Sequence, residues 1–556
     1  MTIVSGLSDL FGRLHNICII GAGPVGMVLA LEFAKLDQHV TVLESGGVTH
    51  SQAAQDLSGA IVEEGGRQVD MSIAVERSLG GTSNLWGAGC VPLDPVDFDD
   101  RPGVDAGWPI TYAEFSRTIA DACAYANCGV PDFDGSLADL HGADDSFSAG
   151  NLIRFADPPS FRTAYAHSLR ESSHIRTYLD ATATDMAFAS DGRISNLTVR
   201  SRSGETGTVR AKAFIIACGG VESARLLLVA RRNTPQRFGG GDGPLGRYYM
   251  GHLSGSIADL EIGNPQLNRS FDFYRDDGNR YARRRFAPSR DLVLREHLNN
   301  VAFWPLMSPM ADPAHRSGIL SMAYLALAFP PTGRMLVSEY LRQLNTAHPA
   351  SKWAHARNII RDAPAIAEFL PRFLHGRFVA RTRLPGLYIR SKAGHYRLHY
   401  HAEHLPNPLS RITLTGHSDA LGMLRVSPGL RFSMADAEPI VRSHQLLADW
   451  LHRSGYGDIV PREPGGDLAA SVLAQASDGV HQVGTVRMGR SARTGVVDAD
   501  CRTFDATNLF VAGSSVFSTS GQANPTFSAI CLAVRLARRV SAEIGRAEAA
   551  MDNAMT

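Results

Sequence analysis

The chain has 556 residues, of which 44% are hydrophobic and 20% are charged, and its 55 Lys and Arg balance its 55 Asp and Glu. This length is too great for one simple core and indicates two or three structural units of an ordinary globular protein. A net charge of zero gives no electrostatic basis for binding nucleic acid.

Targeting and membrane signals are absent from the sequence. No uncharged apolar run of about eighteen residues occurs, and the N-terminus lacks a charged stretch followed by an apolar one, so we expect no transmembrane segment and a cytoplasmic location. The seven cysteines are odd in number, which favours buried free thiols in a reducing compartment. Cys123 and Cys128 have no second pair at zinc-ligand spacing, so we expect no metal there.

The first predicted elements form a βαβ unit. A short apolar run at residues 17–20 is typical of a buried parallel strand, a glycine-rich loop follows at once, and a helical pattern covers residues 27–36. A second strand is expected at residues 39–43 and ends at Glu44. This is the context in which a G-x-G-x-x-G loop binds a dinucleotide.

The glycines of this loop have separate tasks. Gly21 permits the tight turn, Gly23 lets the backbone approach a pyrophosphate, and Gly26 lets helix and strand pack closely. The helix N-terminus favours phosphates, and Glu44 can accept hydrogen bonds from ribose hydroxyls, which favours FAD or NAD over NADP. The alternatives are a structural turn and a surface acid. The loop residues expected at the cofactor are Gly21, Gly23, Pro24, Val25 and Gly26.

Two further strand–turn–helix units follow later in the chain. Residues 213–217 and 508–512 are short apolar runs that end in small residues, with helices expected after residue 220 and over residues 525–544. The dinucleotide domain is therefore predicted to be discontinuous. We expect it to comprise residues 1–110, 166–254 and 471–556, while residues 111–165 and 255–470 form the substrate domain.

The central segment has a different character. Residues 396–401 and 411–415 alternate as half-buried strands of an antiparallel sheet. Residues 333–378 read as mostly helical, with interruptions at Pro349, Pro364 and Pro371. A basic stretch overlaps the end of this segment, and for it a solvated face is favoured over a membrane-facing or partner-facing one. Its arginines are Arg372, Arg377, Arg381, Arg383 and Arg390.

The C-terminal region carries the residues suited to chemistry. His481 lies in the stretch His-Gln-Val-Gly-Thr, and Asn524 lies 43 positions later in Gly-Gln-Ala-Asn-Pro-Thr. A histidine that titrates near neutrality and an amide with both donor and acceptor suit the removal of a proton from an alcohol. The structural alternatives are a satisfied histidine beside a glycine turn and a helix N-cap before Pro525.

Six motifs in this order resemble the glucose–methanol–choline (GMC) family of FAD-dependent alcohol oxidoreductases, over most of the chain. The C-terminal half is especially similar to the branch of pyranose oxidases and sugar or glycoside dehydrogenases, in which a His–Asn pair replaces a His–His pair. The motifs are residues 21–26 with Glu44, residues 80–86, residues 219–225, residues 245–252, residues 481–485, and residues 495–498 through 524–526.

The resemblance implies an α/β fold: a discontinuous Rossmann-like FAD-binding domain plus an α+β substrate domain with an antiparallel sheet. It implies that His481 acts as base while the adjacent C–H delivers hydride to flavin N5, and that Asn524 orients the alcohol. Leu85 stands where some pyranose oxidases carry a flavin-linked His, so we expect non-covalent FAD. The further cofactor-binding residues implied are Gly80, Gly81, Thr82, Ser83, Asn84, Ala183, Gly219, Gly513, Ser514, Asn524, Pro525 and Thr526.

Two of these assignments have alternatives. Asn84 either bonds near flavin N5 or caps a turn. Asp498 is expected near the pyrophosphate or ribityl chain, or merely starts a turn. The histidines of residues 395–404 form a polar wall of the substrate pocket, a solvated sheet face or a metal site, and we expect no metal. They are His395, His399, His401 and His404.

The predicted function is the oxidation of an alcohol group of a sugar, glycoside or cyclitol to a carbonyl, with O2 or another oxidant as acceptor. Alternatives are a non-sugar alcohol and a flavin-containing lyase on the same fold. A flavin hydroxylase is disfavoured because Gly241-Asp242 follows a loop and not a strand. A homo-oligomer is possible, with residues 333–392 as an interface.

Overall fold

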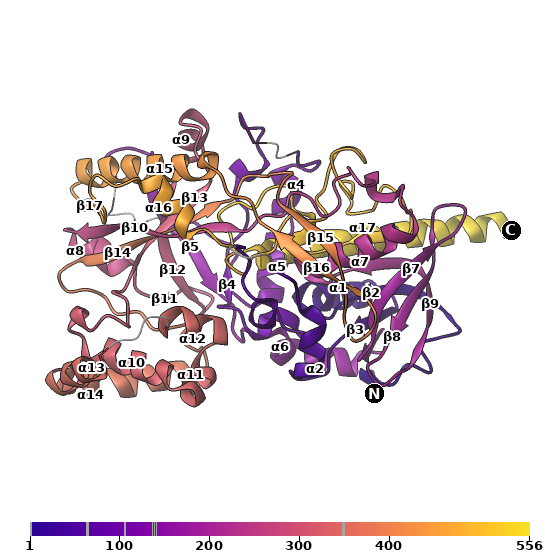
Figure 1. Ribbon diagram of the computed structural model, residues 1–556, viewed down its shortest axis with the longest axis horizontal. Coiled ribbons are helices and arrows are strands. Elements are labelled where there is room, and N and C mark those ends of the chain that lie inside the picture. The colour runs from indigo at the N-terminus through magenta and orange to yellow at the C-terminus, as the bar shows by residue number, and fades with distance from the viewer. Residues whose placement is uncertain are drawn as a thin grey trace.

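The computed structural model describes residues 3–62, 66–104, 107–135, 137, 140, 142–346 and 351–555. Two large sheets lie at opposite ends of an elongated molecule, and the long C-terminal helix projects beyond one of them (Figure 1). Each sheet has its own hydrophobic core. The α/β fold class predicted from the sequence is confirmed.

The first sheet has eight strands in the order β1-β6-β3-β2-β9-β8-β7, with β18 also paired to β9. The neighbouring strands β1, β6, β3, β2 and β9 pair in parallel, and β18 pairs in parallel with β9. Strand β8 pairs antiparallel with both β9 and β7. The bounds are β1 Ile3–Ser5, β2 Leu14–Ile20, β3 Val40–Glu44, β6 Ile175–Leu179, β7 Thr182–Phe188, β8 Ile194–Arg200, β9 Thr206–Ile216 and β18 Leu509–Val511.

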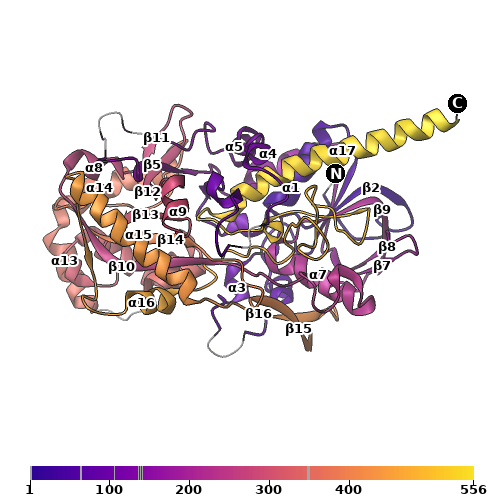
Figure 2. The same cartoon turned by 90° about the horizontal axis from the view of Figure 1, so that it is seen from above.

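Helices cover the parallel part of this sheet. Helix α1 follows β2, and α17 packs along α1, as Figure 2 shows. Both helices are rich in Ala, Val and Leu, and their apolar faces join the core of the first sheet. The bounds are α1 Pro24–Lys35, α2 Gln52–Gln55, α3 Met71–Ala74, α4 Tyr112–Ser116, α5 Ile119–Ala126, α6 Phe161–Glu171, α7 Gly219–Asn233 and α17 Pro525–Met555.

The second sheet is antiparallel, with the order β17-β10-β14-β13-β12-β5-β4, and β11 pairs with β12. Helices α15 and α16 pack on one face of it. The bounds are β4 Gly89–Cys90, β5 Phe147–Phe155, β10 His252–Ile262, β11 Tyr274–Arg275, β12 Tyr281–Pro288, β13 Val301–Leu306, β14 His395–Glu403, β17 Gly457–Pro461, α8 Pro265–Ser270, α9 Arg290–Arg295, α15 Met434–Arg453 and α16 Leu468–Gln475.

The predicted strand at residues 411–415 does not join this second sheet. It is β15, Arg411–Ser418, which pairs with β16, Leu424–Gly429, and packs against α7 of the first unit. Ile412 and Val426 are buried in the core of the first sheet. The strand pair β15–β16 therefore belongs to a part of residues 255–470 that contacts the core of the first sheet. The predicted domain limits at residues 110, 165, 254 and 470 remain predictions.

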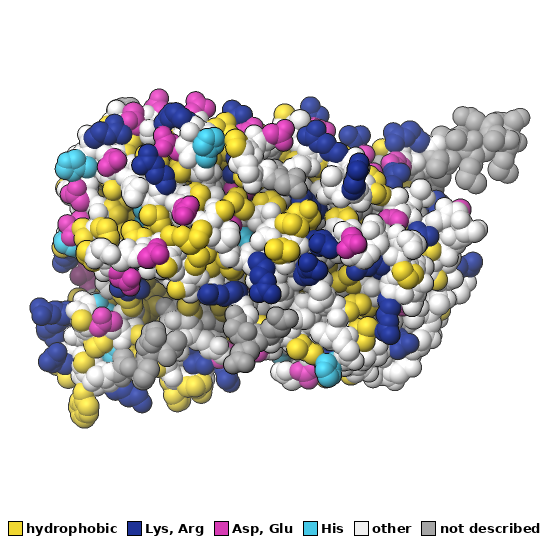
Figure 3. Space-filling view, turned by 45° about the horizontal axis from the view of Figure 1, so that its top comes forward, with side chains coloured by type: hydrophobic (Ala, Val, Ile, Leu, Met, Phe, Trp, Pro, Cys, Tyr) yellow, Lys and Arg dark blue, Asp and Glu magenta, His cyan; other side chains and the backbone are white. Residues whose placement is uncertain are grey.

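The helical insertion consists of α10 Gly318–Ala328, α11 Pro330–Leu336, α12 Glu339–Thr346, α13 Lys352–Arg361 and α14 Ala363–Leu374. Pro364 begins α14, where its missing N–H costs nothing, whereas Pro371 lies inside α14 and does not end it. Pro349 lies outside the described residues. Trp353 and Ile360 are 87% and 77% exposed, and Figure 3 shows basic and apolar side chains together at this lower left edge.

Seven cysteines are free thiols, and all but Cys218 are buried, as predicted. Among the helices of the described part of the chain, none combines the length and the apolar character that a membrane crossing needs.

Candidate active site

A cavity of about 680 Å³ opens between the two sheets. One end, here called the dinucleotide end, is lined by the loop after β2, the end of β3 and the start of α7. The other end, here called the substrate end, is lined by side chains of β12, β13 and β14, among them Arg283, Arg285, Trp304 and His401. A cavity at the carboxyl ends of parallel strands, closed by a second unit, is a usual place for a cofactor and its substrate.

The glycine loop at the dinucleotide end has the geometry that the sequence predicts. Gly21 has φ +104°, and a Cβ there would lie 2.6 Å from the Ala217 carbonyl oxygen. A Cβ on Gly26 would lie 1.9 Å from the Gly21 carbonyl oxygen, so only glycine permits this close approach of helix and loop. No atom lies within 4 Å of a Cβ built on Gly23, which faces open space. Helix α1 begins at Pro24 without a side-chain cap, and its first N–H groups can bind an anion.

Glu44 lies buried beside this loop. Its Oε2 accepts a hydrogen bond from Ala22 N at 2.9 Å, and its Oε1 accepts one from Gly46 N at 2.8 Å. Burial raises the pKa of Glu44 against the lowering effect of these two bonds. The surface-acid alternative is therefore wrong. The carboxylate fixes the loop and also lines the cavity, where a bond to a ribose hydroxyl remains a prediction.

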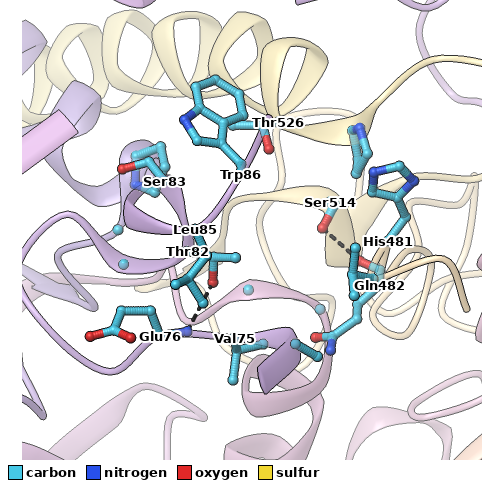
Figure 4. A pocket seen from close by; sticks show the side chains of 18 of the residues that line it. Val75, Glu76, Thr82, Ser83, Leu85, Trp86, His481, Gln482, Ser514 and Thr526 are labelled. Carbon is cyan, nitrogen blue, oxygen red and sulfur yellow. Dashed lines mark hydrogen bonds between the residues drawn. The ribbon is translucent and has the colours of Figure 1, made fainter. Parts of the chain in front are cut away.

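The segment at residues 80–86 packs directly on the glycine loop. A Cβ on Gly81 would lie 2.9 Å from Gly23 Cα, so two glycine-containing loops touch at the cavity wall. Ser83 Oγ donates to Gly80 O at 2.6 Å and accepts from Phe161 N at 3.0 Å, which holds the 3-10 turn Gly81–Asn84. Thr82, Ser83, Leu85 and Trp86 line the cavity, as Figure 4 shows.

Asn84 is not brought to the cavity. Its Nδ2 donates to Ser78 Oγ and Leu79 O, both at 3.1 Å, and its Oδ1 accepts from Ser160 Oγ at 2.6 Å. These bonds favour the turn-capping alternative. Asp498 likewise bonds to its own turn, accepting from Asp500 N and Arg502 N, and it does not line the cavity.

His481 and Asn524 meet at the middle of the cavity. Asn524 Nδ2 lies 3.3 Å from His481 Nε2, although the residues are 43 positions apart. Asn524 directly precedes α17, and both side chains are half-buried on the cavity wall. The two predicted catalytic residues are thus within hydrogen-bond distance of each other.

Some of the other predicted cofactor-binding residues line the cavity, and others only support its wall. Gly80 and Gly26 support the cavity wall without lining it. Ser514 Oγ donates to Gln482 O at 2.6 Å, which ties the loop after β18 to the His481 segment. The remaining residues that line the cavity are Gly21, Gly23, Pro24, Val25, Ala183, Gly219, Gly513, Ser514, Pro525 and Thr526.

Two further histidines complete the site, and the sequence did not assign them a role beside His481. His481 Nδ1 lies 3.1 Å from His252 Nδ1, and the ring of His252 stacks on that of His401 at 4.3 Å. Each of the three offers a ring nitrogen within 4.8 Å of the others. His401 Nδ1 lies 2.8 Å from Gln522 O, a carbonyl that can only accept.

The hydrogen bonds assign the tautomers of this cluster. Asn524 Nδ2 can only donate, so His481 Nε2 accepts and the His481 proton lies on Nδ1. That proton points to His252 Nδ1, which must then accept it. Burial lowers the pKa of His481 to about 3 and, for the same reason, that of His401 to about 4. The cluster is therefore neutral at pH 7, and the expectation that His481 titrates near neutrality is wrong for the folded protein.

The predicted histidine group of residues 395–404 separates into different environments. His401 lines the substrate end of the cavity, and His399 bonds Ser254 Oγ at 3.1 Å behind it. His395 is exposed, whereas His404 is buried, accepting from Gly251 N and bonding Arg431 O. The polar-wall interpretation describes His401 only.

Sequence reasoning also missed the two arginines of the substrate end. Arg283 and Arg285 lie on β12 in the run Tyr-Ala-Arg-Arg-Arg-Phe, where the alternation of a strand puts them on one face and Arg284 on the other. The alternation of side chains along this strand was visible in the sequence, but it did not indicate which face of the strand lines the cavity.

The chain is similar to several known proteins. Residues 406–533 match the model of the family described as GMC oxidoreductase. The chain is 22% identical to paromamine 6'-oxidase of Streptomyces fradiae, over 96% of this chain and 92% of that protein. It is 42% identical to a C-glycoside 3-oxidase of Microbacterium trichothecenolyticum, over 22% of this chain and 26% of that protein. The crystal structure of pyridoxine 4-oxidase from Mesorbium loti superposes with a TM-score of 0.49 at 17% identity, covering 94% and 99% of the two chains.

The predicted resemblance is confirmed for the C-terminal part of the chain: residues 406–533 carry the C-terminal domain of the GMC oxidoreductase family. The chain is an enzyme of the class that oxidises CH–OH groups. Enzymes of this family generally bind FAD, and the open space at Gly23, the uncapped start of α1 and the cavity volume of about 680 Å³ fit a dinucleotide.

Proposed function

We propose that the protein oxidises an alcohol group of a sugar, glycoside or cyclitol to a carbonyl, with FAD as cofactor, His481 as base and Asn524 as the residue that orients the alcohol. The observation that carries this proposal is the 3.3 Å contact between Asn524 Nδ2 and His481 Nε2 on a cavity that also reaches the glycine loop. FAD, when bound, supplies the acceptor for the hydride that leaves the alcohol carbon.

The chain's own residues would handle the proton. An alcohol oxygen that enters between the two side chains can accept a hydrogen bond from Asn524 Nδ2 and donate its proton to His481 Nε2. His481 Nδ1–H donates to His252, which fixes the ring with Nε2 toward the cavity. The low pKa of His481 keeps Nε2 unprotonated and ready to accept.

The sugar-like substrate class is supported by the lining of the substrate end. Trp304 provides an aromatic face, and Ser254 and His401 provide polar groups beside it. Sugars are commonly bound by this combination of an aromatic surface and a few fixed hydrogen-bonding groups. The names of two relatives, paromamine 6'-oxidase and C-glycoside 3-oxidase, point the same way.

Several finer assignments belong to the same proposal. Leu85 lines the cavity and has no nucleophilic atom, which supports non-covalent FAD. O2 or another oxidant would re-oxidise the cofactor. A cytoplasmic location and a homo-oligomer through the helical insertion remain predictions.

The test is anaerobic mixing of the purified holoenzyme with monosaccharides, glycosides, cyclitols, aminosugars and simple alcohols, with the visible band of the oxidised flavin as readout. Bleaching by a sugar class supports the proposal, and admission of air then tells an oxidase from a dehydrogenase. Bleaching only by simple alcohols favours the non-sugar alternative. A compound that is turned over while the flavin stays oxidised favours the lyase.

A further inference from the structure

Two buried arginines without a carboxylate partner lie at the substrate end of the cavity. Arg285 is 2% exposed and Arg283 is 9% exposed, and both line the cavity from β12. Within the described part of the chain, neither forms an ion pair with an Asp or Glu. A buried charge is costly unless an opposite charge or a full set of hydrogen bonds compensates it.

Among the described residues, the hydrogen-bond acceptors of Arg285 are two neutral amides. Its Nη1 donates to Gln522 Oε1 at 2.9 Å and its Nη2 to Asn151 Oδ1 at 2.5 Å. Its buried Nε has no hydrogen-bond partner among the described residues. Burial lowers the pKa of Arg285 to about 10, so the guanidinium stays charged at neutral pH with donor groups left over.

Arg283 is held by the backbone and by an aromatic ring. Its Nε donates to Phe271 O at 3.0 Å and its Nη2 to Pro305 O at 2.6 Å, while the guanidinium stacks over Tyr388 at 4.1 Å. These contacts fix its orientation. Burial lowers the pKa of Arg283, and the nearby Asp272, which raises that pKa, is itself paired with Arg390 at 3.6 Å.

The position of this pair relates it to the catalytic histidines. Arg285 bonds the side chain of Gln522, whose backbone oxygen bonds His401, and the ring of His401 meets that of His481 edge-on at 5.4 Å. Two residues, Gln522 and His401, therefore connect Arg285 to the proposed proton acceptor. A substrate whose hydroxyl reaches His481 would present its far side to them.

The acids of the cavity lie elsewhere and are already engaged. Glu222 pairs with Arg77 and Arg225, and Asp419 pairs with Arg225 at 2.7 Å. Glu44 accepts two backbone bonds, and Glu76 pairs with His50. Among the described lining residues, the substrate end thus has two fixed positive charges and no acid.

We infer that the substrate carries an anionic group, a carboxylate, and that Arg283 and Arg285 bind it while the alcohol reacts at His481. A guanidinium fork matches a carboxylate in geometry and charge. Gln522 Nε2 also donates to Asp94 Oδ2 at 2.9 Å, which offsets part of the charge on Arg285 and suits a singly charged group better than a phosphate. This inference rests on the proposed function and names its substrate class: a sugar acid or a uronic acid glycoside.

Equilibrium binding tests the site without any chemistry. Tetrahydropyran-2-carboxylate and its neutral amide have no hydroxyl and differ in one charge, and their binding is followed by the change in the spectrum of the bound flavin. We expect the acid to bind roughly 10- to 100-fold more tightly, the factor for one or two charge-assisted hydrogen bonds. Equal binding of the two compounds overturns the inference.

Variants on the same strand give a matched comparison. R283Q and R285Q should each weaken binding of the acid more than binding of the amide. R284Q is the control, because Arg284 points the other way and its Nε donates to Gly135 O. If R285Q does not retain FAD, R283Q carries the test. Preference for the acid that survives in both Arg283 and Arg285 variants contradicts the inference.

A matched substrate pair separates this inference from the proposed function. Methyl glucoside and methyl glucuronide differ only in a hydroxymethyl and a carboxylate group. Faster anaerobic bleaching by the glucuronide supports both proposals. Equal or faster bleaching by neutral or amino sugars leaves the proposed function standing and overturns the anionic substrate. Tight acid binding with no bleaching by any sugar supports the anion site and overturns the proposed function.

Discussion

Acidification is expected to leave the rate of flavin reduction unchanged between about pH 8 and about pH 5. Burial, and then the neighbouring His401, lower the pKa of His481 from 6.5 to about 3. This lowering of the pKa corresponds to about 5 kcal/mol against the imidazolium form. At about pH 5, roughly 99% of His481 should still be neutral, whereas a free imidazole would be only about 3% neutral.

The assay is an anaerobic stopped-flow pH jump. The enzyme is held near neutral pH and mixed with substrate in acidic buffer, so that reduction is recorded before the protein can unfold. A flat profile supports the neutral, buried base. An acid limb with an apparent pKa near 6.5, absent from a variant without His481, would refute the electrostatic reasoning.

Three further predictions follow from the structure. Trichloroacetic acid or heat should release all of the flavin into the supernatant, because Leu85 cannot bond to it covalently; flavin that stays with the precipitate contradicts this. Gly26→Ala should reduce FAD content and lower Tm by several degrees, because its Cβ would lie 1.9 Å from Gly21 O, and Gly416→Ala, with open space around its Cβ, is the control for the added methyl group. The free energy of unfolding should fall as pH drops below about 6.5, because histidines of the unfolded chain bind protons that the buried histidines of the folded protein do not bind. Each such histidine should lower the free energy of unfolding by up to about 2 kcal/mol at about pH 5. Chemical unfolding at several pH values measures this slope, and a stability that rises on acidification contradicts it; the histidines are His399, His401, His444 and His481.

The parts of the fold that were predictable are those encoded by local patterns. The first βαβ unit could be read because a strand, a glycine turn and a helix follow one another within residues 14–44, and the structure places β2, α1 and β3 there. The meeting of His481 with Asn524 was predicted from family motifs, since no local rule joins residues so far apart. The same holds for the loop at residues 80–86, where Asn84 had two chemically reasonable roles.

The remaining parts of the site depend on strand register. His252 and His401 meet because β10 and β14 pair antiparallel with Ser254 opposite His401, and no residue pattern specifies that alignment. Arg283 and Arg285 face the cavity for the same reason, through the pairing of β12 with β5. The strand Arg411–Ser418 was expected in an antiparallel sheet, but Ile412 is buried against the first unit, a choice that only tertiary packing makes.

The most direct test of the account is the rate of anaerobic flavin bleaching in His481→Ala beside the wild type and His395→Ala, whose histidine is exposed and distant from the cluster. At saturating substrate, we expect His481→Ala to bleach about 10²- to 10⁴-fold more slowly with its FAD content unchanged, and His395→Ala to behave as wild type. Asn524→Ala, measured in the same series, should slow bleaching more than it reduces FAD content. A His481→Ala enzyme that bleaches at the wild-type rate would contradict the assignment of the base.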